Sequence, residues 1–387
     1  MLGIDTVILT LYPHEFTILK PGDFTPNTNR ILELKPQDMG KGRYMDAKRN
    51  PSKQDNAIAG YLPYLTFYKA VRAGGLTHEL RVQFSASKMV YGNSFDELLA
   101  SDIELMYQRV FDGLKYYGVR FFKGMDTLVN ARVSAIHFAK NFPLTNYMTA
   151  HEAVTEIKKC DVTSWRDVTE SGYANNGHGF KTHSKYYELA FYDKMAEYNK
   201  GRRNQPTFDK DLQLQMNLFN DRKLVQPFEV LRMEARLNNA RTIKTALKKA
   251  GFEDTKVTLD ALCKKDVSQA VLKQQLAELY SRYPKISDAK APDFHKLFSE
   301  LYVQNPKRSM TTILSAVGLK ALNQEDGTRR LKDIVGSRGS PNLLRQVKKI
   351  NHDLAYRFEQ PEVFQLLNEQ IDRFEPVQLS NFVEDIK

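Results

Sequence analysis

The chain has 387 residues, 42% of them hydrophobic, which allows two or three domains with a sizeable core and excludes disorder as the default. Its 57 Lys+Arg against 46 Asp+Glu give a formal charge of +11, which favours a polyanionic partner, nucleic acid first. No apolar run reaches the roughly 18 residues of a membrane span, the N-terminus lacks the basic n-region of a signal peptide, and Cys160 and Cys263 match no metal spacing, so we expect a cytoplasmic protein with no membrane partner.

The N-terminal quarter of the chain predicts three strands. Ile4 to Tyr12 is typical of a first strand that ends at Pro13. Residues 20–60 are rich in Pro, Gly, Asn and charge and predict an irregular excursion. Leu62 to Val71 and Leu80 to Ser87 predict a hairpin around two consecutive glycines.

A long helix and another strand follow. Ser94, with Glu97 three residues later, predicts a capping box for a helix that runs from about Phe95 to Tyr117. Ala131 to Asn141 predicts a strand, and its alternation places on one face Val133, Ala135, His137 and Ala139. A histidine in such a strand is commonly a hydrogen-bonded core residue, since a metal site needs partners as well. Thr149 to Lys159 predicts a helix, and Gly172 to His183 predicts a loop.

The stretch Lys185 to Tyr198 carries the clearest candidate for chemistry. Tyr187, Leu189 and Phe191 alternate as in a half-buried strand, and the pattern becomes helical after Tyr192. Tyr192 with Lys194 two residues away is a plausible nucleophile, because a nearby cation favours the tyrosinate. The alternative is a core tyrosine beside a surface lysine.

A second strand with a charged face lies at residues 228–237. Its alternation places Val230, Arg232, Glu234 and Arg236 on one face, with Leu231, Met233, Ala235 and Leu237 on the other. The charged face is either a solvated sheet surface or a site where arginine contacts phosphate and glutamate binds a hard cation.

Beyond about residue 240 the strands end and the composition predicts helices. The predicted helices are Thr242 to Ala250, Leu259 to Leu262, Ser268 to Tyr280, Asp293 to Val303, Met310 to Leu322, Gly327 to Val335 and Pro341 to Phe358. Residues 305–350 hold ten Lys+Arg against three Asp+Glu, most of the positive excess of the chain. This region is either a solvated helical face or a DNA-binding module.

Four segments resemble, in order, the gene II and gene X replication initiators of filamentous phages and related plasmid replication proteins. Ser85-Ala86-Ser87-Lys88…Gly92-Asn93 resembles the "SPAK…GHN" stretch of the family, without its histidine. Val133-Ser134-Ala135-Ile136-His137 resembles the "ISRID" strand, with His137 in place of the aspartate. Ala190-Phe191-Tyr192-Asp193-Lys194 resembles the Tyr-x-Lys motif, and Leu231-Arg232-Met233-Glu234-Ala235-Arg236 is similar to the "RFEAR" strand. The resemblance covers about residues 1–250.

The resemblance implies an α+β fold in which an antiparallel sheet is flanked by helices, as in HUH-type rolling-circle nickases. The HUH triplet itself is absent, since His137-Phe138-Ala139 holds one histidine. We expect an HUH-like nicking endonuclease domain over residues 1–240 and a helical, basic C-terminal domain over residues 241–387.

The resemblance also implies a mechanism. Tyr192 would attack a phosphate of origin DNA, in single-stranded or duplex form, to give a 5′-phosphotyrosine and a free 3′-OH, with Mg²⁺ or Mn²⁺ held by His137 and Glu234. Lys194 would lower the pKa of the phenol or neutralise the phosphate. The candidate third metal ligands are His183, His178, Glu79 and Asp193. The candidate DNA-binding residues are Lys88, Lys140, Arg232, Arg236, Arg329, Arg330, Lys348 and Lys349.

The replication initiator implied by the resemblance would work with a host helicase and a host polymerase. Two other functions remain open. A non-catalytic replication or copy-control protein would need only the basic surface, and a conjugative relaxase would use the same chemistry for transfer. The absence of a Gly-x-x-x-x-Gly-Lys-Ser/Thr loop is consistent with strand rejoining that needs no ATP.

Overall fold

The computed structural model describes most of the chain. The described residues are 1–26, 43–72, 75–144, 148–160, 162, 167–169, 179–195, 197, 222–224, 229–283, 294–322, 339, 342, 345, 346, 349, 362–378, 380 and 383–385.

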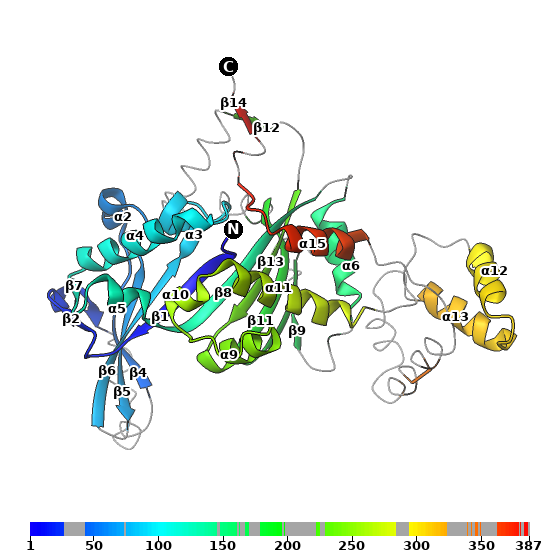
Figure 1. Cartoon of the computed structure of the whole chain (residues 1–387), viewed down its shortest axis with the longest axis horizontal. Helices are drawn as coiled ribbons and strands as arrows, with labels where there is room; N and C mark the ends of the chain where they lie inside the picture. The colour runs from blue at the N-terminus through cyan, green and yellow to red at the C-terminus, as the bar shows by residue number, and fades with distance from the viewer. Residues whose placement is uncertain are drawn as a thin grey trace.

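A ten-stranded sheet forms the centre of the molecule, in the order β3-β4-β5-β6-β1-β8-β13-β11-β10-β9, and every pairing is antiparallel (Figure 1). Its strands are β3 (Thr25–Pro26), β4 (Arg43–Arg49), β5 (Tyr64–Arg72), β6 (Gly75–Ser85), β1 (Ile4–Leu11), β8 (Arg132–Leu144), β13 (Glu229–Leu237), β11 (Tyr187–Asp193), β10 (Gly179–Ser184) and β9 (Asp167–Thr169). Two short pairs stand outside it, β2 (Phe16–Ile18) with β7 (Val119–Phe121) and β12 (Arg222–Leu224) with β14 (Val383–Asp385). The antiparallel α+β class expected from the sequence is confirmed.

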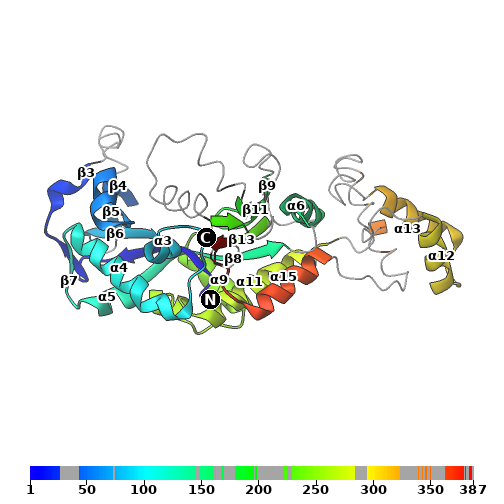
Figure 2. The same ribbon diagram turned by 90° about the horizontal axis from the view of Figure 1, so that it is seen from above.

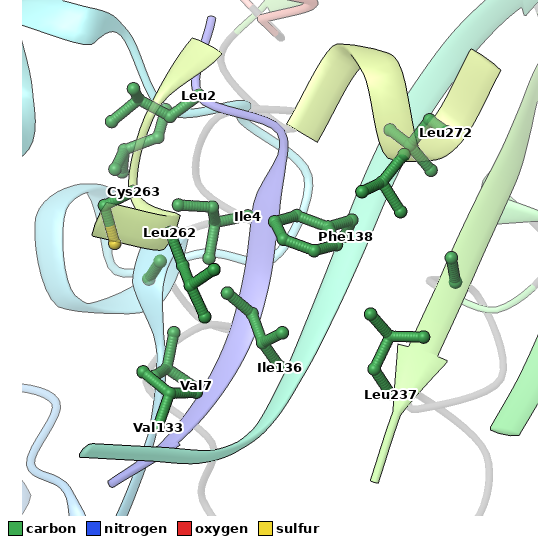
Figure 3. Close-up of a cluster of buried hydrophobic side chains, with 14 of the residues drawn as sticks. Leu2, Ile4, Val7, Val133, Ile136, Phe138, Leu237, Leu262, Cys263 and Leu272 are labelled. Carbon is green, nitrogen blue, oxygen red and sulfur yellow. The ribbon is translucent and has the colours of Figure 1, made fainter. Parts of the chain in front are cut away.

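The two faces of β13 differ as its alternation predicts. Leu231, Met233, Ala235 and Leu237 are fully buried in the main hydrophobic core, whereas Arg232, Glu234 and Arg236 point to the opposite face. Figure 3 shows part of this core, where Ile4 and Val7 of β1 lie beside Ile136 and Phe138 of β8. The sheet therefore has one apolar face and one face free for polar side chains.

Two β-bulges change the expected facing of the central strands. Asp5 is an extra residue in β1, since Ile4 pairs with Phe138 and Thr6 with His137. Ser134 is an extra residue in β8, and its hydroxyl donates to the Ile8 carbonyl at 3.1 Å. The prediction that Val133 shares a face with His137 is therefore wrong, because the bulge turns Val133 into the core.

Helices cover the apolar face of the sheet, and Figure 2 shows α4, α9, α11 and α15 on one side of it. They are α3 (Ala86–Tyr91), α4 (Ile103–Tyr116), α5 (Met125–Val129), α6 (Ala150–Lys158), α9 (Ala240–Lys249), α10 (Leu259–Leu262), α11 (Lys265–Tyr280) and α15 (Glu362–Arg373), with short 3-10 turns at Pro21–Asp23 and Ala100–Asp102. On α11 and α15 the buried residues follow helical spacing, for example Val363, Leu367 and Ile371.

The helices after residue 240 complete the sheet core. Ile243 of α9, Leu272 of α11 and Phe364 of α15 belong to the same hydrophobic cluster as β1, β8 and β13. The N-terminal amino group of Met1 donates to the Phe374 carbonyl at 3.4 Å. The expected boundary at residue 240 is thus wrong for these three helices, because their apolar faces are buried against the sheet.

Two predictions for the N-terminal half are also corrected. Residues 20–60 contain β4 and α2 (Lys53–Ala59), and α2 has a capping box formed by Ser52 and Asp55. The long helix begins at Ile103 and not near Phe95. The Glu97 carboxylate pairs with Lys140 and therefore does not cap a helix at Ser94.

The remaining helices form a second, smaller cluster. Leu297 and Leu301 of α12 (Phe294–Gln304) pack with Ile313 and Ala316 of α13 (Met310–Leu322). The helix expected at Gly327 to Val335 lies outside the described residues, as does most of the one at Pro341 to Phe358. Among the described helices, none is long and apolar enough to cross a lipid bilayer.

Candidate functional site

The polar face of β11 and β13 brings Tyr192 and Glu234 together. The Tyr192 hydroxyl donates to Glu234 Oε1 across the two strands at 2.5 Å. Glu234 is buried, and the Tyr192 side chain is half-buried. A phenol and a carboxylate in this contact form a candidate pair of nucleophile and proton acceptor.

Arg232 is the buried centre of the cluster. Its Nε donates to Glu234 Oε1 at 2.9 Å, its Nη1 to Asn141 Oδ1 at 3.0 Å, and its Nη2 to Asp5 Oδ1 at 2.6 Å. Its side chain is 4% exposed. The expected role of Arg232 in binding DNA is therefore wrong for this arrangement, because its guanidinium is buried and bonded on every nitrogen.

Arg236 holds the outer side of the same carboxylate. Its Nε donates to Glu234 Oε2 at 2.7 Å, and its Nη1 donates to Glu188 Oε1 at 2.6 Å. Glu188 also pairs with Lys181 Nζ at 2.7 Å. The Arg236 side chain is 31% exposed, so among the arginines of this cluster it is the one that solvent reaches.

Ser94 connects the loop after α3 to this cluster. Its carbonyl accepts from Arg232 Nη1 at 3.3 Å, and its hydroxyl accepts from Lys194 Nζ at 3.3 Å. The residue after the Ser85…Asn93 segment, the strand that contains Val133 to His137, and the segments 190–194 and 231–236 therefore contribute to one cluster. Asn93, just before Ser94, holds this loop in place, because its Oδ1 accepts hydrogen bonds from the backbone amides of residues 95 and 96.

The electrostatics keep the Tyr192 proton in place. Burial and then the Glu234 carboxylate raise the pKa of Tyr192 well above its usual value. Arg232 and Arg236 hold the pKa of Glu234 well below its usual range, against the effect of burial. The pKa of this phenol is therefore raised, against the expectation that Lys194 lowers it, and the alternative that Lys194 neutralises the phosphate stays a prediction. Lys194 Nζ lies 5.9 Å from the ring centroid and pairs with Glu197 at 2.6 Å.

His137 and Glu234 do not form a ready metal site. His137 lies opposite Arg236 in the sheet, and its Nε2 is 3.3 Å from Asn238 Oδ1. Burial lowers the pKa of His137, which suits a neutral ligand, but both Glu234 oxygens accept from guanidinium groups. In the described part of the chain, no group of three or more His, Cys, Asp or Glu side chains is placed to hold a metal ion. A divalent cation bound by this pair therefore does not fit the arrangement.

The candidate third ligands do not change this result. Asp193 lies opposite Leu231 and not opposite Glu234, and Glu79 lies on β6 opposite Tyr68. His183 lies opposite Glu188 on β10, and His178 is outside the described residues.

Lys140 has a structural environment. Its side chain is 2% exposed, and its ammonium pairs with Glu97 at 2.9 Å and donates to the Glu375 carbonyl at 2.9 Å. Its expected contact with DNA is therefore wrong, because it points to the helix-covered face. Lys88, on α3, lies 5.8 Å over the Tyr61 ring and is partly exposed.

Most of the C-terminal candidates cannot be placed. Lys349 is helical and exposed, whereas Arg329, Arg330 and Lys348 lie outside the described residues. Their role in binding DNA stays a prediction.

Sequence reasoning missed Asp5, Asn141, Glu188 and Lys181 as members of the cluster. Glu188 could have been found from strand alternation, because it shares a face with Tyr192, whereas Lys181 lies in a stretch whose composition predicts a loop. Asp5 could not, because its direction depends on a bulge. In comparisons with known proteins, no family model, curated protein or solved structure matches this chain.

Proposed function

We propose that this chain is a DNA nicking and rejoining enzyme of rolling-circle replication, with Tyr192 as its nucleophile. The observation that carries the proposal is the Tyr192–Glu234 hydrogen bond of 2.5 Å, beside a partly exposed Arg236 that can bind phosphate. Two of the four motif segments of the resemblance supply this contact, and Ser94, directly after the first segment, bonds to Arg232 and Lys194 beside it. The formal charge of +11 favours a nucleic-acid substrate.

In the proposed reaction, the Tyr192 oxygen attacks phosphorus and the bond to the 3′-oxygen breaks. The product is a 5′-phosphotyrosine and a strand with a free 3′-OH. The reverse attack by a 3′-OH restores Tyr192 and closes the strand. The phosphodiester energy is retained in the covalent link, so the cycle needs no ATP.

A non-catalytic DNA-binding protein is the second candidate, and a specific observation favours it. Arg232 and Glu234 are buried and fully bonded, as in a structural ion-pair network. The raised pKa of Tyr192 fits that interpretation as well. A relaxase would share the nicking chemistry, and the DNA in which its site lies separates transfer from replication.

The test uses a supercoiled plasmid that carries the gene for this chain with its flanking DNA. The full-length protein should convert it to the open circle and remain covalently attached to a 5′ end. Tyr192→Phe should give no covalent product while its DNA affinity is nearly unchanged, because one hydroxyl contributes little to a phosphate-dominated interface. Tyr186→Phe is the matched control, since that exposed tyrosine lies in the turn that leads into β11, the strand that holds Tyr192. Covalent product from Tyr192→Phe would reject the assignment.

A further inference from the structure

The charges around Tyr192 balance before any DNA is bound. The groups that face Tyr192 and Glu234 come from seven elements and connections: Asp5, Ser94, His137, Lys181, Glu188, Lys194, Glu197, Arg232 and Arg236. Each carboxylate in this set pairs with at least one cation: Asp5 with Arg232, Glu188 with Arg236 and Lys181, and Glu197 with Lys194. A phosphodiester that enters this face adds a negative charge and must draw a cation from an existing pair.

Arg236 is the cation that can be drawn away. Arg232 is 4% exposed and bonded to residues of three other segments, whereas Arg236 is 31% exposed and bonded to two carboxylates. If Arg236 turns toward a phosphate, Glu188 still retains Lys181 at 2.7 Å. Glu234 then retains Arg232 on Oε1, but its Oε2 loses its partner.

From this geometry we infer that Glu234 is the general base for Tyr192 and that Arg236 is a substrate-operated switch that sets its basicity. The inference rests on the nicking function proposed above. The scissile phosphate takes the Arg236 guanidinium from Glu234 Oε2. Glu234 Oε1 then accepts the hydroxyl proton of Tyr192 as the bond from the tyrosine oxygen to phosphorus forms. The bond from phosphorus to the 3′-oxygen breaks, and that oxygen receives the proton from Glu234 through solvent.

The switch explains why a strongly ion-paired carboxylate can serve as a base. With Arg236 in place the pKa of Glu234 is far too low for proton acceptance, so the Tyr192 phenol keeps its proton until DNA binds. Removing one of two guanidinium groups raises the pKa of the carboxyl. The base is therefore active only when a phosphate is already bound at the position of attack.

The first test compares two pH–rate profiles of single-turnover cleavage by the full-length protein. The probe is a labelled single-stranded oligodeoxynucleotide that spans the nick mapped in the plasmid assay. The rate at low oligonucleotide concentration reports the free protein, and the rate at saturation reports the complex. The acid limb should lie at higher pH in the complex, because the bound phosphate has taken Arg236 from Glu234.

Arg236→Met should remove this difference by moving the acid limb of the free protein to higher pH. Its side chain is partly exposed, so the variant should fold. Arg241→Met is the matched control, since it removes the same charge from an exposed position on α9 and should keep the two limbs apart. Coincident limbs in the unaltered protein, or a difference that survives in Arg236→Met, would overturn the switch.

The second test asks whether Glu234 takes the proton. Glu234→Gln should slow cleavage by about 10²- to 10⁴-fold, the usual contribution of a general base. Incorporation of a fluorinated tyrosine at position 192, whose phenol is more acidic, should restore much of the lost rate in this variant, since an ionised phenol needs no base. A Glu234→Gln protein that folds and shows no such rescue would reject Glu234 as the base. If that variant does not fold, the Arg236→Met profiles decide alone.

The controls separate the two levels of the proposal. Failure of the unaltered protein to form a Tyr192-dependent covalent product rejects the nicking function. A Tyr192-dependent product with coincident pH limbs leaves the nicking function standing and rejects only the switch.

Discussion

Arg232 and Arg236 are the same residue type on one strand face, yet they have different physical roles. The exposed fraction of the side chain is 4% for Arg232 and 31% for Arg236. A buried guanidinium must keep its partners, because an unpaired buried charge is costly. A guanidinium at the solvent boundary can exchange a carboxylate for a phosphate at small cost. Exposure, and not residue type, therefore separates the structural arginine from the candidate contact with DNA.

The same residues predict the response to divalent cations. Added Mn²⁺ should not raise the melting temperature of the DNA-free protein, since both Glu234 oxygens are already paired with arginines. A cation site occupied at 100 times its Kd would stabilise the fold by about 2.7 kcal/mol, which a thermal shift detects easily. His137→Ala should behave like the unaltered protein, with His183→Ala as the control. A Mn²⁺-dependent rise that only His137→Ala removes would restore His137 as a ligand.

At the scale of elements, the sequence predicts a helix or strand correctly where hydrophobic periodicity alone determines it. The prediction fails where a contact with a residue distant in the sequence determines the local structure. The alternation over β13 was readable because every second side chain enters the core, and α13 was predicted at its observed bounds. The capping box at Ser94 failed because Glu97 instead accepts from Lys140 and from the backbone amides of Asn141 and Val377. The capping box at Ser52 on α2 lies in a stretch whose polar composition predicts an irregular segment.

The contact between Tyr192 and Glu234 was only half predictable. The resemblance pointed to both residues separately, and strand alternation gave each a face. Their pairing required the strand order, in which β13 lies between β8 and β11. Strand order in an antiparallel sheet depends on long-range packing, so a single sequence does not specify it.

Glu97 joins three elements, and its loss should destabilise them together. It accepts from Lys140 on β8, from the Asn141 amide and from Val377 beyond α15. Glu97→Gln leaves the Lys140 ammonium buried without its counter-ion and should cost about 3–5 kcal/mol in urea unfolding. Adding Lys140→Met should recover part of that loss, because the uncompensated charge is then removed.

The control is an exposed pair in the same sheet. Lys69→Met removes a partner of Asp46 from a pair whose side chains are about one-third exposed, and should cost about 0–1 kcal/mol. Lys140→Met should also leave DNA affinity unchanged, since the ammonium does not reach solvent. A variant that binds DNA more weakly at unaltered stability would return Lys140 to the DNA interface.

At the scale of the whole molecule, the basic segment lies in the sequence between two segments that belong to the core, and it is not a terminal addition. Tyr283, after α11, lies with its ring centroid 5.5 Å from that of Phe364 on α15. Tyr283 and Phe364 are therefore neighbours in the same hydrophobic core. The segment in between contains the separate α12–α13 cluster and the basic residues 305–350. The basic segment can thus be removed between Tyr283 and Phe364, because the two ends left behind lie next to each other.

This geometry predicts which truncation folds. A fragment of residues 1–250 lacks α11 and α15, so it exposes the apolar face of β8 and β13 and should show no cooperative unfolding by circular dichroism. Replacing residues 284–361 with a Gly-Ser linker of about eight residues, which is ample for neighbouring ends, should keep the fold.

That linker variant should still cleave the single-stranded oligonucleotide, because it retains Tyr192 and every described partner of Glu234. It should bind duplex DNA with a shallower salt slope, by about 0.9 log unit per log unit of salt for each phosphate that it no longer neutralises. Charge reversal at Lys349 in the full-length protein should reduce the slope in the same direction, since that side chain is exposed. A linker variant that folds, cleaves and keeps the full slope would place duplex binding on the sheet body instead, with Arg236 and Lys181 as the first residues to test.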